Sequence, residues 1–275
     1  MPRPFPPVKP PPLEEQRGET YPRLVELMQR LLAPDGCPWD REQSYQSLSR
    51  YMLEEASEAV DAIDRGDLDE LCEELGDVLL QVVFLGELGR RDGAFGPDDV
   101  VAAIVDKLVR RHPHVFGDVV VEGAKDVVHN WERIKARERD RQGKQRGLLA
   151  SVPRSLPALT RAQRVGEKAA EVGFDWPRQD GPRQKVDEEL AELDRARQAG
   201  DVDRIREELG DTLFALVNLA RHLGIDAEAA LRGTIDKFGE RFAHVEERVN
   251  ERHGGFANAE LSLTDLDAYW DEAKR

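Results

Sequence analysis

The sequence predicts an all-α fold made of two helical-bundle domains that arose by internal duplication. A pattern of four acidic residues occurs twice, each time as E-x-x-E followed by E-x-x-D. In both copies the second pair begins nineteen positions after the first Glu of the first pair. Apolar residues recur at helical spacing around both copies. No long stretch alternates apolar and polar residues as a half-buried strand does. Tandem helical bundles are therefore expected.

The acidic pattern predicts two clusters of metal ligands. The eight positions are Glu55, Glu58, Glu74 and Asp77 in the first copy, and Glu189, Glu192, Glu208 and Asp211 in the second. Carboxylates three residues apart share a helix face. A Gly-Asp pair between the two helices of each copy predicts an antiparallel turn, so the four acids converge. Hard divalent cations prefer such oxygen ligands, and without a cation the carboxylates repel one another.

A simpler interpretation is that the acids form solvated helix faces, since 35% of the residues are charged. Two details favour a site instead. Glu55 and Glu189 lie within apolar stripes at helical spacing. Gly76 and Gly210 interrupt the second helix of each copy, at a cost of about 1 kcal/mol relative to Ala. A glycine repeated at that place predicts a helix or a ligand packed close to the backbone.

Composition limits the function further. The net charge of −15 argues against general affinity for nucleic acid or anionic membranes. Only two cysteines occur, Cys37 and Cys72, without a CxxC pair, so neither a disulfide framework nor a thiolate zinc site is expected. No secretory signal and no apolar run long enough to span a bilayer are visible. A cytoplasmic protein is expected.

Turn residues and apolar spacing divide the chain. A proline-rich leader at 1–19 is expected to be disordered. The N-terminal domain is assigned to 20–142, a linker to 143–150 and the C-terminal domain to 151–275. Loops are expected at 33–40, which ends in GCPWD, at 93–98, and at 173–177, where GFDWP echoes GCPWD. The expected helices cover 21–32, 48–63, 71–88, 100–111, 126–141, 160–172, 184–198, 202–223, 226–251 and 264–274.

The duplication extends past the acids to basic and aromatic residues at matching spacings. These are Lys107, Arg111, Trp131 and Lys135 in the first half, and Lys237, Arg241, Trp270 and Lys274 in the second. Carboxylate-held metal with a Lys and an Arg is typical of sites that grip a polyphosphate. The alternatives are basic residues that suit a helix C-terminus and tryptophans that belong to the core. No Walker loop and no nucleophilic triad is present.

The ordered motifs resemble the MazG nucleoside triphosphate pyrophosphohydrolases in their tandem form. The resemblance runs from Tyr21 to Arg275, through GCPWDxxQS, LEEASE, ELGDVLLQVVF, KLVRRHPHVF and NWERIK to PRSLPALTRAQ, VGFDW and ELGDTLFALVNLARHLG. It implies a Mg²⁺-dependent homodimer, with Mn²⁺ as a possible substitute, that converts NTPs and dNTPs to monophosphate and pyrophosphate. By match, the second acidic copy binds metal, Lys185, Lys237 and Arg241 contact phosphates, and Trp270 and Lys274 close over the nucleotide.

Which half is catalytic is a separate prediction. The first half retains its four acids and its Lys, Arg, Trp and Lys, so it is a possible second site. However, Tyr51 stands where the second copy has Lys185, and Pro113 ends the helix that carries Arg111. Catalysis is therefore assigned mainly to the C-terminal domain and assembly mainly to the N-terminal domain. Two alternatives stay open: a narrower dNTP or alarmone pyrophosphohydrolase, and a nucleotide-sensing or RNA-docking scaffold that uses the basic tract 133–146.

Overall fold

The computed structural model describes residues 19–274, apart from 122, 124, 125, 128, 129, 132, 133, 135–137, 139–146, 179 and 259. Over these residues it is helical without a β-strand, which confirms the all-α prediction. The chain divides into two units, Met1–Gly143 and Lys144–Arg275. None of the described helices is long and apolar enough to cross a membrane. The leader 1–18 and most of 126–146 lie outside the described residues.

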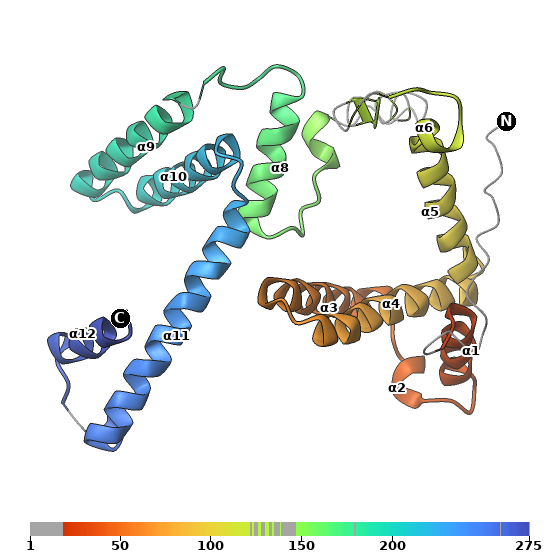
Figure 1. Cartoon of the computed structure of the whole chain (residues 1–275), viewed down its shortest axis with the longest axis horizontal. Helices are drawn as coiled ribbons and strands as arrows, with labels where there is room; N and C mark the ends of the chain where they lie inside the picture. Colours follow the sequence, from red (N-terminus) through yellow and green to blue (C-terminus); the bar gives the residue numbers. More distant parts are fainter. Residues whose placement is uncertain are drawn as a thin grey trace. The chain divides into compact units, whose positions relative to one another are not determined.

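The first unit contains α1 (Tyr21–Leu32), α2 (Pro38–Arg41), α3 (Tyr45–Arg65), α4 (Leu68–Arg91), α5 (Pro97–Arg111) and α6 (Pro113–Phe116). α3 and α4 form an antiparallel hairpin, and α1 and α5 pack against α4 (Figure 1). The core of this unit is built around Met28, Leu48, Val83, Phe84 and Leu88. α4 supplies three of these five side chains and is therefore the central helix of the unit, as its apolar sequence predicts.

The second unit contains α8 (Ala158–Ala170), α9 (Asp180–Ala199), α10 (Val202–His222), α11 (Ala227–His253) and α12 (Leu263–Glu272), preceded by a 3₁₀ turn at Leu148–Ser151. α9 packs along α10, α8 packs against α10, and α12 packs against α11 (Figure 1). Val245, Val249 and Tyr269 form the core between α11 and α12. The acidic hairpin and the α11–α12 pair are thus separate parts of this unit.

The turn of each acidic hairpin uses the same local chemistry. Gly66 and Gly200 have φ values of 72° and 71°, a left-handed conformation that suits glycine and ends α3 and α9. Asp67 and Asp201 then cap the next helix, because the Asp67 carboxylate accepts from Glu70 N at 3.0 Å and that of Asp201 from Arg204 N at 3.1 Å. The predicted Gly-Asp turn is confirmed in both copies.

Several predicted helix boundaries were wrong by a few residues, and prolines or a cap explain three of these differences. The expected loop GCPWD contains α2, which begins at Pro38, because proline suits the first position of a helix. α9 begins at Asp180 and not at 184, since Pro182 lies in the first turn, where its missing N–H costs nothing. α3 begins at Tyr45, capped by Ser44, whose hydroxyl accepts from Ser47 N.

Candidate metal and nucleotide site

The α9–α10 hairpin brings most of the second acidic set together. Carboxylate oxygens of Glu189, Glu208 and Asp211 all lie within 4.8 Å of one another. Glu189 and Glu208 are buried, whereas Asp211 is exposed. Glu192 is outside this three-residue group and pairs with Arg195 at 2.9 Å. Three of the four predicted acids therefore converge, and Glu192 is instead held by Arg195.

This second cluster carries its own counter-cations. Burial raises the pKa of Glu208, and the charge of Glu192 raises it further, while Arg204 opposes the shift. Arg204 lies 3.2 Å from a Glu208 carboxylate oxygen, and Lys185 Nζ lies 2.7 Å from Glu189 Oε1. The Glu189 carboxylate in turn raises the pKa of Lys185. These i,i+4 pairs neutralise part of the cluster, and Lys185 lies at its edge.

The first cluster is built alike but lacks those cations. Oxygens of Glu55, Glu58 and Glu74 lie within 4.8 Å of one another, and Asp77 is outside this group. Burial raises the pKa of Glu55, and Asp77 adds to the shift, so Asp77 is still close. Within the described part of the chain, no Lys or Arg pairs with these four acids. Glu74 Oε2 is buried without a hydrogen-bond partner there, which suits a cation ligand.

Tyr51 occupies the place in the first copy that Lys185 has in the second. Its hydroxyl accepts from Arg50 at 2.5 Å, and the guanidinium lies 4.5 Å from the ring centroid. The Trp39 ring meets Tyr51 edge-on at 6.0 Å. The nearest cation in sequence is therefore engaged with an aromatic side chain and not with the acids.

The glycines of the two ELGD segments do not have the close neighbour that the sequence predicted. A Cβ built on Gly76 or Gly210 would meet no atom within 4 Å. Leu75 and Leu79 are exposed beside Gly76, and Leu209 and Leu213 are exposed beside Gly210. Among the described residues of one protein molecule, no helix packs closely on these two glycines. That expectation was wrong, because this face of each hairpin is open.

The basic and aromatic residues of the second copy gather on α11 and α12. The Arg241 guanidinium lies 5.8 Å from the Trp270 ring centroid, Lys274 pairs with Asp271 at 2.9 Å just past α12, and Lys237 is exposed. Among the described residues, none of these side chains pairs with the acids of α9 and α10. Figure 1 shows why: α11 leads away from the acidic hairpin. Within one protein molecule, the candidate phosphate-binding residues and the acids therefore lie apart.

The corresponding residues of the first copy are more constrained. Arg111 pairs with Glu138 at 2.7 Å, and Arg110 pairs with the same carboxylate at 2.6 Å. Arg111 accordingly lowers the pKa of Glu138. The Trp131 ring packs edge-on against His112 at 5.0 Å, and Lys107 is exposed. Lys135 lies outside the described residues.

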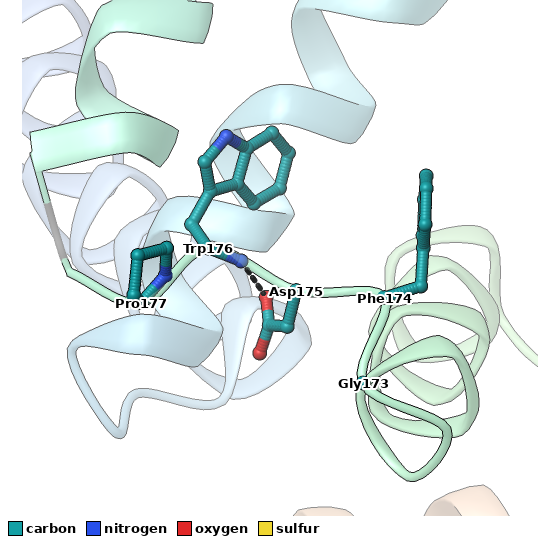
Figure 2. Close-up of a pocket in the computed structure, with 5 residues that line it drawn as sticks. All are labelled: Gly173, Phe174, Asp175, Trp176 and Pro177. Atoms are coloured by element: carbon teal, nitrogen blue, oxygen red, sulfur yellow. Dashed lines mark hydrogen bonds between the residues drawn. The ribbon is translucent and has the colours of Figure 1, made fainter.

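Sequence reasoning treated the segment Gly173–Pro177 only as a loop. In the structure these five residues line a hollow of about 320 Å³ (Figure 2). Both Asp175 oxygens accept from Arg221, at 2.6 and 2.9 Å, and one of them lies 2.9 Å from His222 Nε2. The alternation of aromatic and acidic residues in Phe174, Asp175 and Trp176 is the signal that was available.

Comparison with known proteins identifies the same segments. A model described as the MazG nucleotide pyrophosphohydrolase domain matches residues 43–116 and 182–246, one segment in each half. The nucleoside triphosphate pyrophosphohydrolase of Escherichia coli K12 is 47% identical over 92% of this chain and 96% of its own length. The nucleoside triphosphate pyrophosphohydrolase/pyrophosphatase MazG of Thermotoga maritima is 43% identical over 94% and 98%. A crystal structure of a mazG-related protein from Thermotoga maritima, 26% identical, matches 42% of this chain and 98% of its own with a TM-score of 0.37.

Proposed function

Because this chain belongs to the MazG nucleotide pyrophosphohydrolase family, we propose that it hydrolyses nucleoside triphosphates to nucleoside monophosphate and pyrophosphate. The single observation that carries the proposal is the convergence of Glu189, Glu208 and Asp211 beside Lys185. Three carboxylates and one ammonium provide oxygen ligands for a divalent cation and a contact for a phosphate oxygen. We propose broad tolerance for the base and for ribose or deoxyribose.

The chemistry of the donor set fits Mg²⁺, with Mn²⁺ as a substitute. Glu189, Glu192, Glu208 and Asp211 would hold the ion, since all four offer hard oxygen donors, and Glu192 needs only to leave Arg195. A bound divalent cation supplies charge neutralisation on the phosphate oxygens and makes an attacking water more acidic. Lys185 and Arg204 pair with these acids and would contact the triphosphate when the ion is bound.

The remaining proposed contacts lie on α11 and α12. Lys237 and Arg241 would bind the pyrophosphate that leaves, and the planar fork of Arg241 would grip two oxygens at once. Trp270 and Lys274 would close over the nucleotide. Arg241 already lies over the Trp270 ring, so both reach the substrate together. Since α11 leads away from the acidic hairpin of its own molecule, these residues would reach the acids of a second molecule of this protein (Figure 1).

A homodimer explains two exposed apolar stripes in the second unit. Leu209, Leu213 and Leu216 are exposed on α10 at i, i+4 and i+7. A second exposed stripe on α11 has the same helical spacing and consists of Leu231, Ile235, Phe238 and Phe242. Contiguous apolar faces of this kind mark interaction surfaces. A partner packed on the α10 stripe would also approach Gly210 closely. This glycine would then have the close neighbour that it lacks within a single molecule.

Two contrasts support catalysis mainly in 151–275 and assembly mainly in 20–142. The second cluster has Lys185 at its edge, whereas the first has Tyr51, so at this position only the second cluster offers a cation to the triphosphate. Arg241 has no carboxylate partner among the described residues, whereas Arg111 is held by Glu138. A site must neutralise the charge that develops on the phosphates, and the first copy has fewer cations available for that purpose.

Product analysis tests the proposal. The purified protein is incubated with Mg²⁺ and each NTP, dNTP or alarmone-type nucleotide, and pyrophosphate is measured against orthophosphate. We expect NMP and pyrophosphate from both purine and pyrimidine substrates. Formation of ADP and orthophosphate from ATP would contradict the proposed bond choice. Turnover of one nucleotide alone would replace broad tolerance with a narrower dNTP or alarmone activity, and no turnover at all would favour the scaffold alternative.

A further inference from the structure

The segment Gly173–Pro177 presents two aromatic rings on one side and an acid on the other. Figure 2 shows the Phe174 and Trp176 rings rising on the same side of the segment, with the Asp175 carboxylate on the opposite side. Alternate residues of an extended segment point in opposite directions, which places the two rings together. The Phe174 side chain is 82% exposed and Trp176 is 39% exposed. Two large apolar rings thus face solvent across a hollow of about 320 Å³.

The Asp175 carboxylate holds the segment in this conformation from the side opposite the two rings. Both of its oxygens accept from Arg221 near the end of α10, and the Trp176 backbone N–H donates to the same carboxylate at 2.9 Å. Arg221 lowers the pKa of Asp175, so this acid stays charged and paired at neutral pH. The Trp176 ring also lies edge-on to His222 at 6.3 Å. The carboxylate is therefore neutralised and turned away from the hollow, which leaves the hollow apolar.

The hollow and the acidic cluster lie along one stripe of α9. The ideal Cβ position of Gly181 lies 2.2 Å from Cδ1 of Trp176, so the ring packs directly on that backbone. Gly181, Lys185 and Glu189 are spaced four residues apart and form one stripe on α9. Eight residues of helix span about 12 Å. A ligand laid along this stripe would have its phosphates at Lys185 and Glu189 and its other end at Trp176.

We propose that the hollow between Phe174 and Trp176 receives the base of the nucleoside triphosphate, with the Trp176 ring as its stacking surface. The inference rests on the proposed function and names the part of the site that takes the nucleoside. Apolar ring faces and a neutralised acid suit a flat heterocycle and do not suit another phosphate. The Gly173–Pro177 side chains offer ring faces, and their only carboxylate is engaged by Arg221. Stacking of this kind accepts every base, which accounts for broad tolerance.

The test compares substrates with and without a base. ATP, UTP and ribose 5-triphosphate, which has the same scissile bond and no base, are assayed on wild type, Phe174→Ala, Trp176→Ala and Trp176→Phe. Loss of one stacking surface is expected to lower kcat/KM for ATP and UTP by about tenfold. Ribose 5-triphosphate is expected to be turned over at an unchanged rate, and Trp176→Phe is expected to retain most of the ATP activity. Phe174 is so exposed that its removal leaves folding intact, which melting temperatures check.

Trp39→Ala is the matched control, since Trp39 is the exposed tryptophan of the corresponding GCPWD segment in the first unit. It is expected to leave all three substrates unchanged. Equal losses on ATP and ribose 5-triphosphate, or an effect of Trp39→Ala in place of Trp176→Ala, would overturn the inference. If wild type cleaves none of the three substrates, the proposed function itself fails. The base subsite is then decided by calorimetric binding of ATP to wild type and Trp176→Ala.

Discussion

Gly181→Ala displaces the Trp176 ring without removing any aromatic atom. The added Cβ would lie 2.2 Å from Cδ1, 2.7 Å from Cγ and 3.0 Å from Nε1 of Trp176. Carbon atoms in van der Waals contact are about 3.5 Å apart or more, so the ring must retreat by roughly 1.3 Å. Since Trp176 is partly exposed, it can rotate toward solvent. The ring would then leave the stripe formed by Gly181, Lys185 and Glu189.

Two opposing effects make the change in stability small. Alanine is preferred over glycine in a helix by about 1 kcal/mol, whereas overpacking costs about 1 to 3 kcal/mol. The melting temperature of Gly181→Ala should therefore lie within a few degrees of wild type or somewhat below it. Activity should change more, because kcat/KM is expected to fall by about tenfold for ATP and to stay unchanged for ribose 5-triphosphate.

Gly239→Ala on α11 is the control, because a Cβ there meets no atom within 4 Å. This variant should gain about 1 kcal/mol of stability, roughly 3 °C in Tm, which calibrates the effect of an alanine that meets no side chain of its own molecule. The assay measures Tm by calorimetry and initial rates by pyrophosphate release. If Gly181→Ala is as stable as Gly239→Ala and turns over ATP like wild type, then Trp176 is not positioned by Gly181, and the argument from the shared stripe of α9 is refuted.

Four further outcomes are expected. Glu208→Gln should remove nearly all turnover and Glu74→Gln should leave most of it, both as folded dimers by light scattering; equal losses would contradict the assignment of catalysis to the second half. Arg241→Lys should weaken nucleotide binding and slow turnover, because the planar fork is lost, whereas Arg111→Lys should affect mainly Tm through Glu138. Millimolar Mg²⁺ should raise Tm and EDTA should abolish turnover reversibly, since the ion binds the folded clusters; full activity of chelated protein would make the acids structural. Asp175→Asn should lower Tm at neutral pH. Because Arg221 depresses the pKa of Asp175 in the folded state, its stabilisation is present above the ordinary value of 3.8 and is lost below it; the gap in Tm should therefore narrow as pH falls, and a gap independent of pH would exclude this cause.

Local patterns predicted most of the fold. The i,i+3 and i,i+4 spacing of apolar side chains located the long helices, and the Gly-Asp pairs located the turns of both hairpins. Several of the wrong helix starts occur at prolines, which can either end a helix or stand in its first turn. GCPWD was predicted to be a loop and α9 was predicted to begin at 184, although Pro38 and Pro182 lie in the first turn of a helix, where a proline loses no hydrogen bond. Helix starts that contain proline are therefore ambiguous in a single sequence.

The acids could be predicted because both pairs are local, each within one helix. The pair formed by Asp175 and Arg221 could not, since its members are 46 residues apart and only the packing of the hairpin brings them together. The same limit applies to Lys237 and Arg241. Their spacing predicts contacts to phosphate, but α11 separates them from the acids of their own chain, and no local pattern indicates whether they serve the site of their own molecule or that of a partner.

The two acidic clusters illustrate why ligand counting does not assign catalysis. Each offers carboxylate oxygens within 4.8 Å of one another, so both can attract a divalent cation. A triphosphate brings further negative charge to that cation, and its binding depends on the cations that surround the acids. Lys185 and Arg204 are already in place at the second cluster, whereas Arg50 is committed to Tyr51 at the first. Duplication can thus preserve two carboxylate clusters while, among the described residues, only the second has Lys and Arg paired with its acids.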